Sequence, residues 1–227
     1  MLEHKGLDYE LVKVPTGMQA VQVRLAGFSG GTVPALRIDG RRAVGTVAIS
    51  RLLEEVRPEP PLFPAEPARR RAVEEAEAWG ERVLQPIPRR LFRWAVRHDH
   101  AVRVRFSRRL GTPLAQVAAV AMLPVAVFYA RREKASSTER IRRDWDELPG
   151  HLDHVDDLIA AGTIGGEQRN AADFEIGTTL RVMLGCADFE PLIAGRPAER
   201  LARGVWPDYR PRMPSVLPPE IALYRKD

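Results

Sequence analysis

A proline-rich segment near one quarter of the chain length divides the sequence into two parts. The stretch "RPEPPLFPAEP", residues 57–67, has five prolines in eleven residues. Proline lacks an amide hydrogen and fixes φ, so this stretch cannot continue a helix or a central strand. We therefore expect a linker over residues 58–67, between a first domain at 1–57 and a second at 68–227.

The composition is that of a folded protein without disulfides. The chain has 227 residues, 44% of them hydrophobic, which is enough for a substantial core. Its one cysteine, Cys186, excludes internal disulfides and metal clusters built on thiolates, and we interpret it as a semi-buried core thiol. The first ten residues are charged and lack the apolar stretch of a signal peptide. These features favour a cytoplasmic location.

The part before the linker mixes strand and helix patterns. Three short segments predict strands: 9–14 (YELVKV), 33–38 (VPALRI) and 41–45 (RRAVG). The last two flank Asp39–Gly40, a dipeptide typical of tight hairpins. Residues 46–56 then show helical spacing of apolar residues, with Thr46 as the expected N-cap. This mixture predicts a small α/β domain.

The part after the linker shows helical patterns throughout. Apolar residues at helical spacing predict helices over 73–84, 141–159 and 170–184. Pro86 and Pro88 must kink or break any continuation of the first, and Gly162 is suited to end the second. We therefore expect an all-α second domain.

One uncharged segment, residues 113–130 (PLAQVAAVAMLPVAVFYA), has 18 residues, the lower limit for a membrane span. Gln116 and many alanines make it weakly hydrophobic for that length. We interpret it as a buried helix of the second domain, bent at Pro124, and expect no membrane span.

Three stretches, in this order, resemble the glutathione S-transferase family: "TVPALRIDG…AVGTVAISRLLEE", "EPPLFPAEPARRRAVEEAEAW" and "LDHVDDLIAAGTIGGEQRNAADFEIGTTL". The resemblance implies an incomplete thioredoxin-like α/β N-terminal domain followed by an all-α helical C-terminal domain. It also implies a homodimeric transferase of detoxification. Such an enzyme reacts glutathione, or another low-molecular-weight thiol, with a small electrophile.

The resemblance further implies where the thiol binds. Pro34 corresponds to the family's cis-proline, and the backbone of Val33 before it would bind the cysteinyl backbone of the thiol as an added short strand. Gly45 and Thr46 stand where the family has an acidic residue followed by serine, which bind the γ-glutamyl end at a helix N-terminus. Thr46 retains a hydroxyl, but Gly45 has no carboxylate for the ligand's ammonium group. A thiol other than glutathione therefore stays open.

The catalytic residue is not assigned by the sequence. The resemblance starts in the latter half of the family's first helix, whereas the family's catalytic Ser, Tyr or Cys precedes that point. Tyr9 carries the nearest hydroxyl group, but its predicted position within a strand argues against a catalytic role. The family's first strand, which lies between those matching 9–14 and 33–38, also has no counterpart.

Three explanations for this missing strand stay open: a segment upstream of Met1, direct pairing of 9–14 with 33–38, or a loose first domain. Each buried, unmade hydrogen bond costs about 1–3 kcal/mol against a total stability of about 5–15 kcal/mol. We therefore favour an upstream segment. The alternative function is a non-catalytic thiol- or ligand-binding protein that keeps the fold without the active turn.

Residues 89–111 contain eight arginines and one acid. Such basic runs are usually solvated surface, here a helix face followed by a loop, so we expect no nucleic-acid partner. The resemblance implies instead that Arg93 or Arg97 borders the electrophile pocket.

Two other polar groups have structural interpretations. The pairs His98/His100 and His151/His154 lack the spacing of a metal site, and we expect no metal. Asn170 and Asp173 have the spacing of an N-capping box, which the family uses for folding rather than catalysis.

Overall fold

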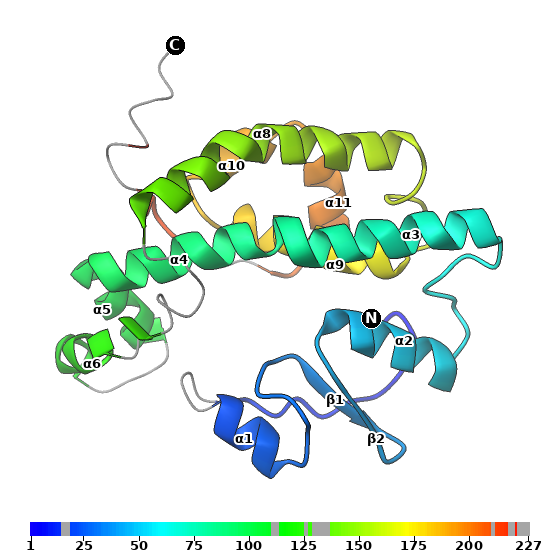
Figure 1. Cartoon of the computed structure of the whole chain (residues 1–227), viewed down its shortest axis with the longest axis horizontal. Helices are drawn as coiled ribbons and strands as arrows, with labels where there is room; N and C mark the ends of the chain where they lie inside the picture. The colour runs from blue at the N-terminus through cyan, green and yellow to red at the C-terminus, as the bar shows by residue number, and fades with distance from the viewer. Residues whose placement is uncertain are drawn as a thin grey trace.

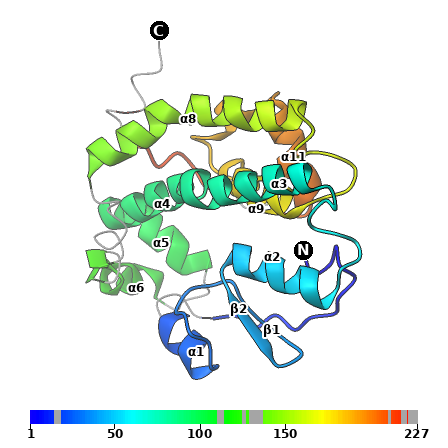
Figure 2. The same cartoon turned by 45° about the vertical axis from the view of Figure 1, so that its right-hand side comes forward.

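The molecule has two parts. A small two-stranded sheet and the helices next to it form one part, and a larger group of helices forms the other (Figure 1). Helix α2 (Thr46–Val56) lies between the sheet and the long helices in both views (Figures 1 and 2). The computed structural model describes these parts of the chain: residues 1–14, 19–109, 114–124, 127–128, 137–209, 212–217 and 221.

The sheet is an antiparallel hairpin of β1 (Ala35–Ile38) and β2 (Arg41–Val44). Asp39 and Gly40 in its turn both have positive φ, 48° and 75°, as a two-residue hairpin turn of the primed type requires. The hairpin and α2 confirm the predicted strands at 33–38 and 41–45 and the predicted helix at 46–56.

The predicted strand at 9–14 is wrong. This segment is extended and has no strand partner among the described residues, and Leu11 and Val12 are well exposed. Direct pairing with 33–38 is excluded as well, because β1 pairs with β2 alone in the described sheet. A strand-like composition forms a strand only where a neighbour supplies backbone donors and acceptors. Helix α1 (Gln19–Leu25), which follows, was not predicted.

The linker contains no helix or strand over residues 57–66 and packs tightly. Leu62 and Phe63 are buried, and their amides donate to the Glu54 carboxylate, at 2.9 and 3.3 Å. The same carboxylate accepts from the buried Lys5 ammonium at 2.7 Å. The Leu62 carbonyl accepts from the Ala171 amide at 2.9 Å, so the linker bonds to both halves of the chain.

One long helical path crosses the molecule: α3 (Pro67–Trp79), the π-helical turn η1 (Gly80–Leu84) and α4 (Pro86–His98) (Figure 1). The predicted break at Pro86 is confirmed, since the backbone forms a π-turn directly before it. Gly80 permits close approach of the neighbouring helix, because a Cβ there would lie 2.9 Å from a side-chain carbon of Ile176.

The remaining large helices are α8 (Thr138–Ala160), α9 (Ala171–Met183) and α11 (Pro197–Val205), with the short α10 (Glu190–Ile193). Helix α9 is central, and its Ile176, Leu180 and Met183 are fully buried. At its N-terminus the Asn170 side chain accepts from the Asp173 amide at 3.1 Å, and the Asp173 carboxylate accepts from the Asn170 amide at 2.9 Å. This capping box fixes the start of the central helix.

Two expectations between α4 and α8 are wrong. Residues 100–109 form a helix, α5 (His100–Arg109), rather than a loop. The segment 113–130 is not one buried helix, because α6 (Ala115–Ala121) has seven residues and its large apolar side chains are exposed. The absence of charged residues suggests a buried helix, but it does not show which face of a short helix packs against the rest of the protein. Within the described residues, no helix has the length and apolar character needed to cross a bilayer.

Candidate functional site

The end of the β-hairpin and the start of α2 are joined by a backbone hydrogen bond. The Gly45 amide donates to the Pro34 carbonyl at 2.9 Å. The structure therefore brings together the two pairs that the resemblance singles out, Val33–Pro34 and Gly45–Thr46. The Val33–Pro34 peptide bond is cis, in agreement with the resemblance.

Val33 presents a free stretch of backbone next to this contact. It lies just before β1 and is 48% exposed. Among the described residues, no backbone group donates to or accepts from Val33. An extended peptide-like ligand can therefore bond to its N–H and C=O in the manner of an added strand.

The N-terminus of α2 is open. Gly45 is the N-cap, with φ 89°, and no side chain among the described residues caps the helix, so the prediction of Thr46 as N-cap is wrong. Thr46 is instead the first helical residue. The positive φ explains glycine at 45, and a Cβ there would meet nothing within 4 Å. The uncapped amides and the helix dipole suit a carboxylate in this open space.

Glu175 lies behind this helix start and was missed by the sequence analysis. It comes from the middle of α9 and is 1% exposed, and the neighbouring Thr46 side chain favours its charged form. Its Oε1 atom has no partner among the described residues. Burial first, and then repulsion by Glu81 and Glu77, raises the pKa of Glu175 to about 7, against the attraction of Arg89. A carboxyl group that titrates near neutral pH therefore adjoins Thr46.

Glu175 can be recognised as a candidate site residue only from the tertiary packing, because it belongs to no sequence motif. The one signal in the sequence is an acid between Phe174 and Ile176, within a helix whose neighbours are apolar. Such an acid is buried only when the helix is packed on several sides.

A second buried carboxylate fixes α2 against α3. Glu77 accepts from the Ser50 hydroxyl at 2.6 Å and from the Arg51 guanidinium at 2.7 Å. Burial nevertheless raises the pKa of Glu77, against those two bonds. The Arg51 guanidinium also lies 4.1 Å from the ring centroid of Phe63 in the linker. These contacts hold the start of α2 in a defined position relative to the helical part.

Arg93 and Arg97 lie on α4, one and two turns after Arg89. The four-residue spacing places all three on one face of that helix. Part of the basic run is structural: Arg90 forms two hydrogen bonds with Asp144, at 2.5 and 2.7 Å. Arg89 acts electrostatically on Glu175, so this arginine row begins next to the carboxyl group behind Thr46.

Tyr9 and Cys186 are not activated for catalysis as the structure places them. The Tyr9 hydroxyl donates to Glu3 at 2.9 Å, and that bond raises the pKa of Tyr9. Burial raises the pKa of the Cys186 thiol to about 12. Both groups stay protonated at neutral pH.

The histidines contact aromatic rings. His98 stacks on Trp94 at 4.6 Å between centroids, and His154 meets Trp79 edge-on at 4.6 Å. Across the described part of the chain, no three His, Cys, Asp or Glu side chains are placed to hold a metal ion.

Comparison with known proteins relates the first part of the chain to one family. Residues 1–61 match the family model described as glutathione S-transferase, N-terminal domain, a span that contains Val33, Pro34, Gly45 and Thr46. Mouse maleylacetoacetate isomerase is 40% identical over 73 residues, which are 30% of this chain. The first 61 residues therefore match the glutathione S-transferase family.

A solved structure shows a similar fold over most of this chain. It is a glutathione S-transferase from Rhodospirillum rubrum F11, 21% identical, with a TM-score of 0.51. The match covers 88% of this chain and 90% of that one. The mouse match covers only about a third, 34%, of the isomerase. The chain therefore has a thioredoxin-like N-terminal part and a helical C-terminal part.

Proposed function

We propose that this protein binds a thiol of the glutathione class and reacts it with a small electrophile. The observation that carries the proposal is the Gly45–Pro34 hydrogen bond of 2.9 Å, because it joins an exposed backbone edge at Val33 to an open helix start at Thr46. Glutathione is an extended tripeptide with a carboxylate near one end. A site that binds it needs an exposed backbone edge next to a helix start that can hold the carboxylate.

Each end of the ligand has a partner in this proposal. The cysteinyl backbone bonds to the N–H and C=O of Val33, and the γ-glutamyl carboxylate accepts from the Thr46 hydroxyl and the first amides of α2. Gly45 has no side chain to meet the ligand's ammonium group. The carboxylate of Glu175, behind Thr46, supplies the negative charge instead.

The electrophile that we propose is an electron-poor alkene that carries a carboxylate, because Arg93 and Arg97 extend the arginine row of α4. The thiolate sulfur adds to one alkene carbon, and the π-electron pair moves onto the adjacent carbonyl as an enolate. Return of the proton that the thiol lost, to the other alkene carbon next to the carbonyl, completes conjugation. Rotation followed by loss of the thiolate instead returns the isomerised alkene. The name of the mouse relative, maleylacetoacetate isomerase, favours the second outcome.

The solution state proposed here follows family analogy. We propose a homodimer in the cytoplasm that uses no metal and no nucleic acid. Sedimentation velocity, and retention on a nucleic-acid column as a comparison, would test these points.

Thiol-affinity chromatography combined with turnover tests the function. We expect retention on immobilised glutathione, and glutathione-dependent reaction of maleylacetone or a chlorinated dinitrobenzene. Retention without turnover of either electrophile would instead establish a non-catalytic thiol-binding protein. Neither retention nor turnover in a folded sample would contradict the proposal.

A further inference from the structure

Helix α6 and its N-cap residue turn their larger apolar side chains outward. Leu114, Val117 and Val120 repeat every three residues, and their exposed fractions are 77%, 63% and 63%. The small Ala119 is fully buried against α5. A soluble helix normally shows the opposite arrangement, with large apolar residues inside.

The orientation of α6 is fixed by hydrogen bonds from a buried arginine. Arg103 of α5 is buried, and its guanidinium donates to the carbonyls of Val96 and Arg97, both at 2.9 Å, and of Ala119, at 3.1 Å. One side chain therefore ties together α4, α5 and α6. Both views place the hairpin of α5 and α6 below the end of α4, away from α8 (Figures 1 and 2).

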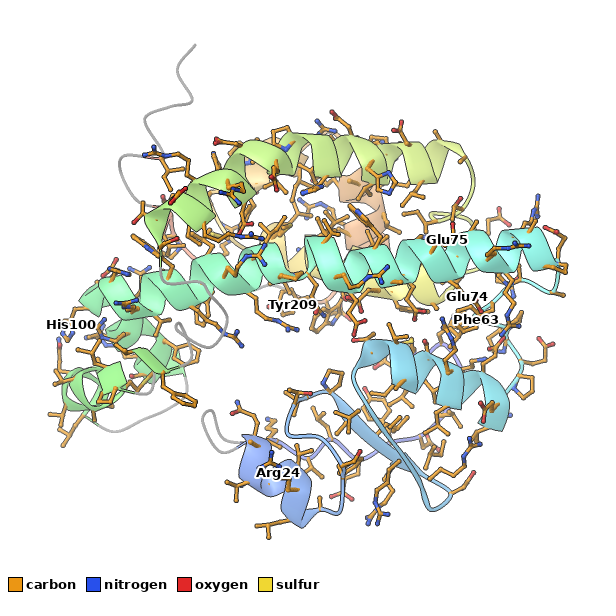
Figure 3. The ribbon with its side chains drawn as sticks, viewed as in Figure 1. Arg24, Phe63, Glu74, Glu75, His100 and Tyr209 are labelled. Atoms are coloured by element: carbon orange, nitrogen blue, oxygen red, sulfur yellow. The ribbon has the colours of Figure 1, made fainter. Side chains whose placement is uncertain are left out.

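The surroundings of the apolar face are positively charged. Four of the ten residues of α5 are arginines, and none is aspartate or glutamate. A hollow of about 270 Å³ next to α6 is lined by His100 (labelled in Figure 3), Arg105, Arg108 and Gln116, among others. Gln116 precedes Val120 by four residues, so the basic hollow borders the apolar face on the same helix.

We propose that the α5–α6 hairpin is a docking surface for an anionic phospholipid membrane. Val117 and Val120 enter the boundary between headgroups and acyl chains, while Arg105 and Arg108 contact lipid phosphates. A second copy of the chain fits less well, because a two-fold contact through this face would oppose two sets of arginines.

The test is cosedimentation of the full chain with vesicles. We expect binding to vesicles of phosphatidylcholine with phosphatidylglycerol, weakened by salt, and little binding to phosphatidylcholine alone. The pair V117D/V120D should abolish binding. The pair R105Q/R108Q should weaken it about 30-fold, as expected for two surface arginines. Val182→Asp on α9 and Arg24→Gln on α1 (labelled in Figure 3), both exposed residues, should bind like the original chain.

Circular dichroism and thermal unfolding of each variant show that it is folded. Three results would overturn the proposal: no binding to anionic vesicles, binding that V117D/V120D leaves unchanged, or a dimer that V117D/V120D dissociates while vesicle binding is absent. Thiol binding is measured separately and does not enter this test.

Discussion

The buried carboxylate of Glu175, in the middle of α9, lies next to the Thr46 side chain in the first turn of α2, and Thr46 lowers the pKa of that carboxyl group. The two residues lie in different halves of the chain, on either side of the linker. A charge that belongs to the helical half therefore acts at the helix start where the other half is proposed to hold its ligand.

Substitution of Glu175 by Gln should weaken glutathione binding about fivefold, because the neutral amide no longer attracts the ligand's ammonium group. A glutathione analogue without the amino group should bind both proteins equally. Isothermal titration at about pH 8, where Glu175 is ionised, measures both ligands. Glu75→Gln is the matched control, since Glu75 is exposed on α3 (Figure 3). An equal loss for both ligands would show that Glu175 only supports the local structure.

Glu175 should also make the stability of the protein depend on pH. Its pKa is raised from 4.5 to about 7 on folding, so the folded state binds this proton more tightly than the unfolded state does. The free energy of unfolding therefore falls as pH rises from about 4.5 to about 7, by about 3 kcal/mol.

Urea unfolding at several pH values, compared with Glu175→Gln, isolates this effect. The variant should gain stability relative to the original chain as pH rises, while Asp173 acts equally in both proteins. Parallel pH curves for the two proteins would refute the assigned pKa.

Substitution of Glu54 by Gln should destabilise the protein by about 3 kcal/mol, because the Lys5 ammonium stays buried without its partner charge. The same substitution weakens the bonds from the linker amides of Leu62 and Phe63. Chemical denaturation measures the loss. Glu55→Gln, next to it but paired with Arg41 on the surface, should change stability by less than about 1 kcal/mol.

The arginine row can be tested through substrate preference. Arg93→Gln and Arg97→Gln should raise KM for an alkene that carries a carboxylate and leave KM for an uncharged electrophile unchanged. Steady-state kinetics with glutathione at a fixed concentration would show the split. A parallel change for both electrophiles would remove the two arginines from the electrophile pocket.

Local patterns sufficed for much of the fold. Asp39–Gly40 predicts the hairpin because few dipeptides accept two positive φ angles in succession. The apolar spacing of 46–56 and 170–184 predicts α2, which buries one face, and α9, which is buried on most sides.

The wrong and missed predictions have one cause. In each case the structure depends on a neighbouring element that the local sequence does not specify. Residues 9–14 lack a strand to pair with in the described sheet, and the outward face of α6 is set by the contacts of Arg103. Glu175 becomes a candidate only where α9 meets α2. The hydrophobic pattern indicates that a face is buried, but it does not say which element covers it.

The most direct test of the proposed thiol site is the response of individual backbone amides to glutathione. In nitrogen-15 NMR spectra of the full chain, saturating glutathione should shift the amide signals of Val33 and Thr46 more than those of exposed α3 residues such as Glu75. Unchanged Val33 and Thr46 signals at saturation, or shifts confined to other elements, would contradict the account.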